Sequence, residues 1–203
     1  MSMQIEGGAE GYAASPRLVE YVVTLTQSLS ARLNTILASQ GCGYQISEKE
    51  QTNKLAVCLG DGSRYDKHID NGGGGDMRKL TALLYLQPSD WHDDNEDGDH
   101  NDNDDGNGNY KYPNESEKDD ERGGYFRAYD APTAGEVTSI APKGDGLLLF
   151  WSDSLVHDVS PSYAPNGDDD RRWALTVWFV VDQVDAIRTT SAEVEDRHFG
   201  ANG

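Results

Sequence analysis

The sequence has little cysteine, comparatively few basic residues and no long apolar run. Only Cys42 and Cys58 occur in 203 residues. They are too few and too isolated for a disulfide scaffold or a four-thiolate zinc site, so we expect two reduced thiols. Lys and Arg total 17 against 36 Asp and Glu, giving a formal net charge of −19. This charge argues against binding nucleic acid or anionic membranes.

The chain also lacks the marks of targeting segments. No basic stretch precedes an apolar run near the N-terminus, and no stretch of about 18 apolar residues could span a bilayer. We therefore expect an intracellular protein, cytoplasmic or nuclear or both. The length suits one domain with a single site, and we expect a monomer.

Residues 1–14 are rich in glycine and aperiodic, which predicts a flexible N-terminus. Ser15 and Pro16 then supply an N-cap followed by proline at the first helical position, and Gly41 stands where a helix would end. Between them apolar residues recur at steps of three and four, which predicts a core-packing helix of about 24 residues. These residues are Leu18, Val22, Leu25, Leu29, Leu33, Ile36 and Leu37.

Beyond the helix the apolar period shortens, and short apolar or alternating runs are separated by turn residues. This spacing predicts a mainly β domain over residues 15–183, a β-sandwich or jelly roll with a flanking helix. The runs are KLAVCL (54–59), KLTALLYLQ (79–87), GGYFRAY (123–129), EVTSIA (136–141), GLLLFW (146–151) and RWALTVWFVV (172–181). Residues 184–203 are expected to form a short helix and a frayed C-terminal tail.

An acidic insert interrupts the β pattern. Residues 92–122 carry 13 acidic and three basic residues, which predicts a disordered surface loop. The stretch from Asn101 to Gly106 resembles the start of an EF-hand calcium loop. However, the first ligand position is Asn101, and Tyr112 stands where a bidentate Glu is needed. A solvated polyanionic loop is therefore the favoured interpretation.

The residues with the clearest chemical pattern are His68 and Asp70. In an extended strand the period of two places both side chains on one face, so an imidazole and a carboxylate point together. A second distant histidine would complete a facial triad of two histidines and one carboxylate, which leaves metal positions open for other ligands. His157 follows a buried-looking strand, LLLFWSDSLVHDV, and is the preferred third ligand. A plain surface pair of His68 and Asp70 is the alternative.

Arg172 stands at the start of RWALTVWFVV, 15 residues beyond His157. Its planar guanidinium matches a carboxylate in a bidentate manner, so it could anchor an acidic cosubstrate in the barrel mouth. The alternative is an arginine that caps a strand end and pairs with one of the residues Asp168 to Asp170.

Several segments resemble one family across roughly residues 15–182. RYDKHIDN, KLTALLYL, GGYFR, GLLLFWSDSLVHDVSPSYA and RRWALTVWF are similar to the hypoxia-inducible-factor prolyl hydroxylases of the 2-oxoglutarate oxygenases. The resemblance implies a cupin-like double-stranded β-helix and an intracellular prolyl 4-hydroxylase, unrelated to the procollagen type, that serves oxygen sensing. It also implies Fe(II), 2-oxoglutarate, O2 and ascorbate as reductant, and a protein substrate that carries the target proline.

The resemblance also assigns site residues. It implies His68, Asp70 and His157 as catalytic iron ligands and Arg172 as the partner of the cosubstrate's distal carboxylate. Tyr85 is implied to bind the same carboxylate and Thr176 to lie beside the metal. For both, an ordinary core or strand role is the alternative. Substrate contacts are implied for Tyr65, Arg78 and Trp178.

The sequence departs from the family in three places. Leu59 follows Cys58 where the family usually has a tyrosine near the cosubstrate, and the connection from Pro165 to Arg171 is longer. The family also has strands, a helix and a substrate-covering loop before the helix expected here, so peptide turnover is less firmly implied than metal binding. The rival functions are an oxygenase acting on another residue or on a small molecule, and a non-catalytic jelly-roll binding module.

Overall fold

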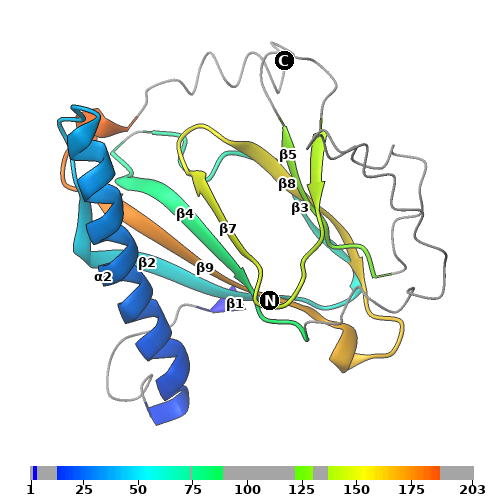
Figure 1. Cartoon of the computed structure of the whole chain (residues 1–203). Coiled ribbons are helices and arrows are strands. Elements are labelled where there is room, and N and C mark those ends of the chain that lie inside the picture. The colour runs from blue at the N-terminus through cyan, green and yellow to red at the C-terminus, as the bar shows by residue number, and fades with distance from the viewer. Residues whose placement is uncertain (1, 4–12, 74, 89–121, 130–136, 188–203) are drawn as a thin grey trace, which may run out of the picture.

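Two antiparallel β-sheets face each other, and one long helix lies against the outside of the larger sheet (Figure 1). The computed structural model describes residues 2–3, 13–73, 75–88, 122–129 and 137–187. The larger sheet has five strands in the order β1-β2-β9-β4-β7, and the smaller has four in the order β3-β8-β5-β6. This arrangement is the jelly-roll fold, the double-stranded β-helix, that the sequence analysis predicted.

The two sheets contain nine described strands. In the larger sheet they are β1 (Ser2–Met3), β2 (Ile46–Cys58), β4 (Arg78–Tyr85), β7 (Leu147–Trp151) and β9 (Arg172–Val181). In the smaller sheet they are β3 (Asp61–His68), β5 (Phe126–Tyr129), β6 (Val137–Ile140) and β8 (Val156–Tyr163). Two short 3-10 helices are η1 (Asp168–Asp170) and η2 (Val184–Ala186).

Helix α2 (Pro16–Ser39) has the predicted length of 24 residues and begins at the predicted proline. At its end Gly41 has a φ of +73°, and the Cys42 N–H donates to the Leu37 carbonyl at 3.0 Å. This is a Schellman motif, in which glycine takes the left-handed conformation without a Cβ penalty. One detail of the prediction is wrong, because Ile36 is 50% exposed and does not belong to the core.

The alternation of side chains along β4 divides the core into two layers. Leu80 and Ala82 pack toward α2 in one buried cluster, together with residues of β9. Leu83 and Tyr85 point the other way and pack between the two sheets against Phe126. Each fully buried large apolar side chain contributes roughly 1.5–3 kcal/mol, so both layers stabilise the sheet that carries the site.

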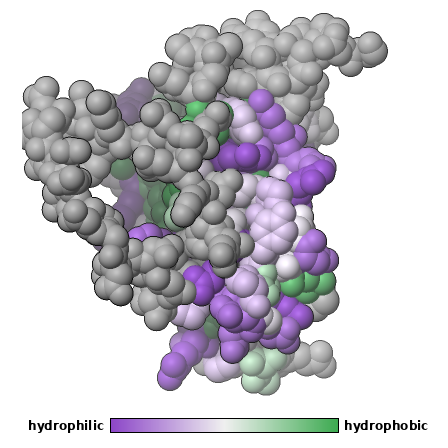
Figure 2. Space-filling model, turned by 90° about the vertical axis from the view of Figure 1, so that its right-hand side faces the viewer, coloured by the Kyte–Doolittle hydropathy of each residue, from purple (hydrophilic) through white to green (hydrophobic). Residues whose placement is uncertain are grey.

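Two strands of the smaller sheet were not predicted. The segment interpreted as turn-rich, GDGSRYDK, falls largely within β3, and His157 lies inside β8 rather than after a strand. Neither strand has an apolar pattern, since β8 buries polar side chains such as His157 and Asp158. Asp158 accepts two hydrogen bonds from the Arg127 guanidinium, at 2.7 and 2.9 Å, so burial of its charge is compensated. Seen from the side of this sheet, the described surface is mainly hydrophilic (Figure 2).

The predictions about the termini and the insert are only partly covered by the structure. Within residues 1–14, Ser2 and Met3 form β1 and pair with Ala56 and Leu55 of β2. The short helix predicted after residue 183 corresponds to η2. Residues 89–121 and 188–203, which include nearly all of the acidic insert and most of the tail, lie outside the described residues. Among the helices that are described, none is long and apolar enough to cross a membrane.

Candidate functional site

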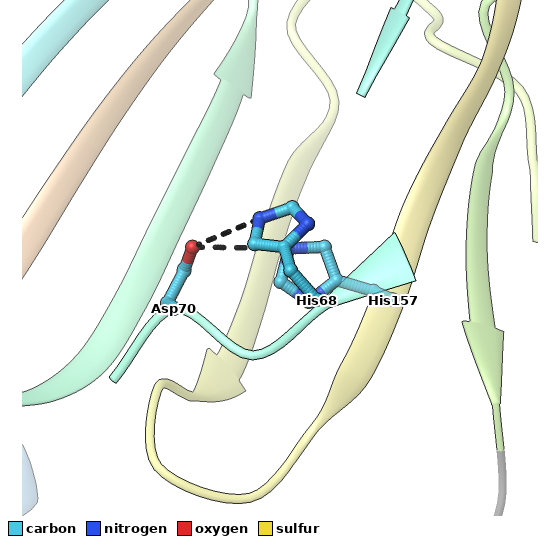
Figure 3. A group of neighbouring side chains, drawn as sticks. All are labelled: His68, Asp70 and His157. Atoms are coloured by element: carbon cyan, nitrogen blue, oxygen red, sulfur yellow. Dashed lines mark ion pairs between the residues drawn. The ribbon is translucent and has the colours of Figure 1, made fainter. Parts of the chain in front are cut away.

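His68 and His157 are brought together by strand pairing in the smaller sheet. They are Cα partners across β3 and β8, and their ring centroids are 4.4 Å apart. Asp70 follows two residues later in a turn that is held by a hydrogen bond of 2.8 Å from the Asn71 N–H to the Ser152 carbonyl. One potential ligand atom from each of His68, Asp70 and His157 lies within 4.8 Å of the other two (Figure 3).

The orientation of the two imidazoles leaves their Nε2 atoms free for a metal. His68 Nδ1 lies 2.7 Å from the Asp66 carbonyl oxygen, and His157 Nδ1 lies 3.1 Å from the Leu155 carbonyl oxygen. A carbonyl only accepts, so each Nδ1 is the protonated nitrogen. The lone pairs of both Nε2 atoms then point toward Asp70 Oδ1, at 3.5 and 3.9 Å. Three electron pairs that converge in this way suit a bound cation.

The second oxygen of Asp70 is held by two donors on the larger sheet. Thr81 Oγ1 donates to Asp70 Oδ2 at 2.6 Å, and Trp178 Nε1 donates to it at 3.1 Å. The Thr81 hydroxyl is also 2.8 Å from the Ser152 hydroxyl. Neither Thr81 nor Ser152 was predicted, and the only signal for them in the sequence is the inward position of Thr81 in the alternating strand KLTALLYL.

The environment keeps Asp70 and His157, but not His68, in the protonation states that a metal needs. Burial alone would raise the pKa of Asp70, but its contacts with His68, His157, Thr81 and Trp178 lower it to about 2. Burial lowers the pKa of His157, which favours the neutral ring. The Asp70 hydrogen bond raises the pKa of His68, whereas burial and the nearby Lys54 charge act against it. His68 is therefore the ligand that protons compete for most readily.

Replacing Thr81 with valine tests how much the outer donors contribute. The change keeps the shape of the side chain and removes the hydrogen bond to Asp70 Oδ2, so the carboxylate loses orientation. We expect metal affinity to fall by about 10–100-fold, as is typical of such outer-shell changes. Anaerobic calorimetric titration with Fe(II) measures this. Thr35→Val, which removes a hydroxyl on the exposed side of α2, serves as the control and should leave the affinity unchanged.

A cavity that is open to solvent lies between the two sheets at this point. Its apolar wall includes Leu83, Phe126, Phe150 and Val159. Phe126 stacks on the His157 ring with a centroid distance of 5.0 Å, and Phe150 meets it edge-on at 4.8 Å. These contacts fix the imidazole and exclude water from one side of the site.

Arg172 lines the same cavity at the level of the Cys58–Arg172 strand pair. It is 2% exposed, yet its Nε and Nη2 atoms have no hydrogen-bond partner among the described residues. The hydroxyls of Tyr85 and Ser162 are likewise buried without a partner there. The Arg172 guanidinium lies over the Tyr85 ring at 5.0 Å, and burial raises the pKa of Tyr85. Unpaired buried donors around a cation suit an incoming carboxylate.

Arg172 is the first residue of β9, but the aspartate pairing that the alternative role requires is not found among the described residues. Asp168 pairs with Arg171 at 2.6 Å, and Asp170 pairs with Arg122 at 3.0 Å. Neither aspartate forms an ion pair with Arg172 in the described part of the chain. Arg172 is thus left without a carboxylate partner, although acidic residues flank it in sequence.

The structure corrects the expectation about Leu59. Leu59 is 42% exposed and is absent from the cavity lining. Cys58 is the residue of this segment that faces inward, with its Sγ atom 3.9 Å from Arg172 Nη1. The position next to the arginine therefore carries a thiol, a weak hydrogen-bonding group.

Gly124 sets the position of the Arg172 side chain. A Cβ atom at Gly124 would lie 2.8 Å from Arg172 Cδ, and the residue has a φ of +73°. We expect Gly124→Ala to displace the guanidinium and to weaken binding of a dicarboxylate ligand about tenfold. Gly41→Ala is the matched control, since Gly41 has the same φ and no atom within 4 Å of the added Cβ. Both variants should lose stability, but equal ligand affinity in the two would contradict the expectation.

Of the other residues implied by the resemblance, three line the cavity, whereas Tyr85 and Arg78 do not. Tyr65, Thr176 and Trp178 line it. Arg78 does not, because its guanidinium donates to Asp76 and to the Asp70 carbonyl, at 2.8 Å for the latter, and lies over the Trp178 ring. The structure therefore gives Trp178 a contact with Asp70 that was not predicted and gives Arg78 a place behind Trp178.

Comparison with known proteins places this geometry in a family. The family model for the 2OG-Fe(II) oxygenase superfamily matches residues 54–180, which is more than half of the chain. The chain belongs to this superfamily. The match begins in β2 and ends in β9, so it covers the three clustered ligands and the arginine of this oxygenase.

Individual relatives can be compared by their sequence identity to this chain, which is 27–29% for the three described next. Egl nine homolog 1 from Rattus norvegicus is 29% identical over 177 residues, which is 86% of this chain and 39% of the relative. A solved prolyl 4-hydroxylase from Phytophthora capsici has 27% identity and a TM-score of 0.61, covering 91% of this chain and 48% of the other. A Trichoplax adhaerens prolyl hydroxylase, solved with a hypoxia-inducible-factor peptide, has 29% identity and a TM-score of 0.58 over 88% and 61%. The oxygenase thus spans about two fifths of the length of the curated relative.

The residues of this chain fit the groups that the superfamily uses. His68, Asp70 and His157 offer two imidazoles and a carboxylate, the donor set of non-haem iron(II) oxygenases. Arg172 lines the cavity with buried donors that have no partner among the described residues, and Tyr85 lies against it, so a carboxylate of 2-oxoglutarate would find its hydrogen-bond donors there.

Proposed function

We propose that this oxygenase hydroxylates a prolyl residue of a protein substrate, using Fe(II), 2-oxoglutarate and O2. The observation that carries the proposal is the convergence of His68, Asp70 and His157 at one end of a cavity whose other end presents the unpaired Arg172. The similarity to prolyl hydroxylases over most of the chain supports the choice of proline as the target.

In this proposal each residue has a defined task. Nε2 of His68 and of His157 and Oδ1 of Asp70 hold the metal, while Thr81 and Trp178 orient the carboxylate through Oδ2. When bound, iron(II) would allow O2 to act as the oxidant, with one oxygen atom converting a C–H bond of proline into C–OH and the other entering succinate as 2-oxoglutarate loses CO2.

The remaining residues bind the cosubstrate and shape the cavity. Arg172 and the neighbouring Tyr85 donate hydrogen bonds to its distal carboxylate, and Thr176 lies beside the metal position. The apolar wall formed by Phe126 and Phe150 keeps water from the reacting groups. We place Tyr65 and Trp178 on the side that meets the substrate. Arg78 acts behind Trp178, because its guanidinium is already engaged by Asp76.

The test incubates the protein with Fe(II), 2-oxoglutarate, O2, ascorbate to keep the iron reduced, and a proline-containing hypoxia-inducible-factor peptide. A gain of one oxygen atom on proline, located by tandem mass spectrometry and matched by equimolar succinate, is the expected result. Succinate without peptide oxidation would redirect the search to another residue or a small molecule. Absence of succinate with every substrate would leave a non-catalytic binding module. Dependence of the rate on O2 concentration would test the oxygen-sensing role.

A further inference from the structure

The cavity contains a second cation, Lys54, that the proposed chemistry does not use. Lys54 lies on β2 and is the Cα partner of Thr176 on β9. One residue pair on the same face of the sheet separates this level from the Cys58–Arg172 pair, so the two cations line one cavity at different depths.

The strand pair between the two cations consists of Ala56 and Ala174. Both alanines line the cavity. Their small side chains leave open space between Arg172 and Lys54, whereas larger residues on this face would fill it. A short, unbranched ligand with an anionic group at each end suits a channel of this form.

Neither cation of the cavity is neutralised within the described part of the chain. The Lys54 ammonium lies over the Tyr65 ring at 4.7 Å and forms no ion pair there. Most other cations that are partly or fully buried have an aspartate partner, namely Arg78 with Asp76, Lys79 with Asp153, Arg122 with Asp170 and Arg127 with Asp158. Lys67, which lies outside the cavity, forms no ion pair with a described residue. In a chain with twice as many acidic as basic residues, an unpaired lysine in a cavity indicates a place for an external anion.

The Lys54 ammonium is also fixed in position. The Tyr65 ring beneath it holds the charge by a cation–π contact. Tyr65 precedes His68 on β3, so this contact directs the lysine to the metal end of the cavity rather than to the Arg172 end.

We propose that Lys54 is a second carboxylate-binding residue, which contacts the carboxylate beside the keto group of 2-oxoglutarate at the metal end of the cavity. The proposal rests on the cosubstrate assignment above and adds to it a residue for the near carboxylate, as Arg172 serves the distal one. Lys54 is a positioning residue in this role, because it orients the cosubstrate and takes no part in bond making.

The test compares ligands with one and two carboxylates. Binding is followed under anaerobic conditions by the charge-transfer absorbance of the Fe(II) complex, first with 2-oxoglutarate and then with 2-oxopentanoate, which lacks the distal carboxylate. We expect Lys54→Met to raise the Kd of both ligands about tenfold or more. Arg172→Met should raise the Kd of 2-oxoglutarate only. Lys54→Arg retains the charge and should restore most of the affinity.

Lys67→Met is the matched control. Lys67 is also a lysine over an aromatic ring, with Nζ 3.8 Å from the Tyr129 centroid, but it does not line the cavity. This variant should bind both ligands as the wild type does. Fe(II) affinity without a 2-oxoacid should not fall in Lys54→Met, which separates an effect on the ligand from an effect on the metal.

Normal binding of both 2-oxoacids by Lys54→Met would overturn the proposal and would point to an acidic group of the substrate as the partner of Lys54. Absence of the absorbance band in the wild type would instead refute the cosubstrate assignment itself. Failure to find a hydroxylated proline would leave the Lys54 result standing, because the binding measurement uses no peptide.

Discussion

Replacement of His157 by alanine is expected to abolish the metal site and all turnover. The imidazole is buried between Phe126 and Phe150 and supplies one of three ligand atoms, so no neighbouring group of the described residues can take its place. We expect Fe(II) affinity to fall by more than about 100-fold, beyond the range typical of changes in the outer shell. Formation of succinate should drop to the level of the reaction without enzyme.

Anaerobic titration with Fe(II) and measurement of succinate check this result together. The control is His92→Ala, which removes a histidine that belongs to the acidic insert in the sequence. It should retain full metal binding and turnover. Substantial succinate formation by the His157→Ala variant would contradict the proposed metal site. Circular dichroism separates this from misfolding, because the β-sheet signal should be preserved.

Replacement of Arg172 by methionine is expected to remove most of the affinity for 2-oxoglutarate. Truncating one member of a buried charge pair costs about 2–5 kcal/mol, which is roughly 30-fold to several thousand-fold in Kd. Metal affinity should change little, because Arg172 lies at the opposite end of the cavity from His68 and His157. The measurement is the Kd of 2-oxoglutarate for the Fe(II)-loaded protein, obtained from the charge-transfer absorbance.

Without ligand, the Arg172→Met variant should be at least as stable as the wild type. A buried guanidinium whose Nε and Nη2 are unpaired opposes folding, so a methionine of similar length should leave the Tm of the ligand-free protein equal or higher. Added 2-oxoglutarate should stabilise the wild type and not the variant. Arg64→Met, at an arginine whose side chain is 61% exposed, is the control and should affect neither quantity. An Arg172→Met variant that binds 2-oxoglutarate normally would remove the arginine from the proposal.

The elements with strong apolar periodicity were predictable from the sequence. The helix from Pro16 to Ser39 has the residue spacing, the initial proline and the terminal glycine that local physics requires. The apolar strands of the larger sheet were predicted for the same reason, since each buries one or both faces. Local signals were sufficient here because hydrophobic burial and glycine geometry depend little on the partner element.

The strands β3 and β8 show where this reasoning fails. In β8 the buried positions include His157, Asp158 and Ser160, which are polar and are stabilised by partners on other strands. The Ser160 hydroxyl, for example, accepts a hydrogen bond from the Tyr125 N–H at 2.9 Å. Such compensation comes from residues distant in sequence, so a hydropathy pattern cannot reveal it.

The sequence by itself determined which residues form the proposed site. His68, Asp70, His157 and Arg172 were chosen from residue types, spacing and resemblance, because metal and carboxylate chemistry restricts the side chains that can serve. Only the tertiary structure decided how these residues are supported. Strand pairing aligns His68 with His157, and the larger sheet brings Thr81 and Trp178 to Asp70.

The tertiary structure also decided which charges stay unpaired. It paired the aspartates near Arg172 with Arg171 and Arg122, and it left Lys54 facing the cavity without a carboxylate among the described residues. Pairing between charges depends on distances across the two sheets, and burial determines its energetic weight. Neither quantity is contained in the local order of residues. For this reason the composition predicted an acidic protein, whereas only the folded sheets created a cavity with a cation at each end.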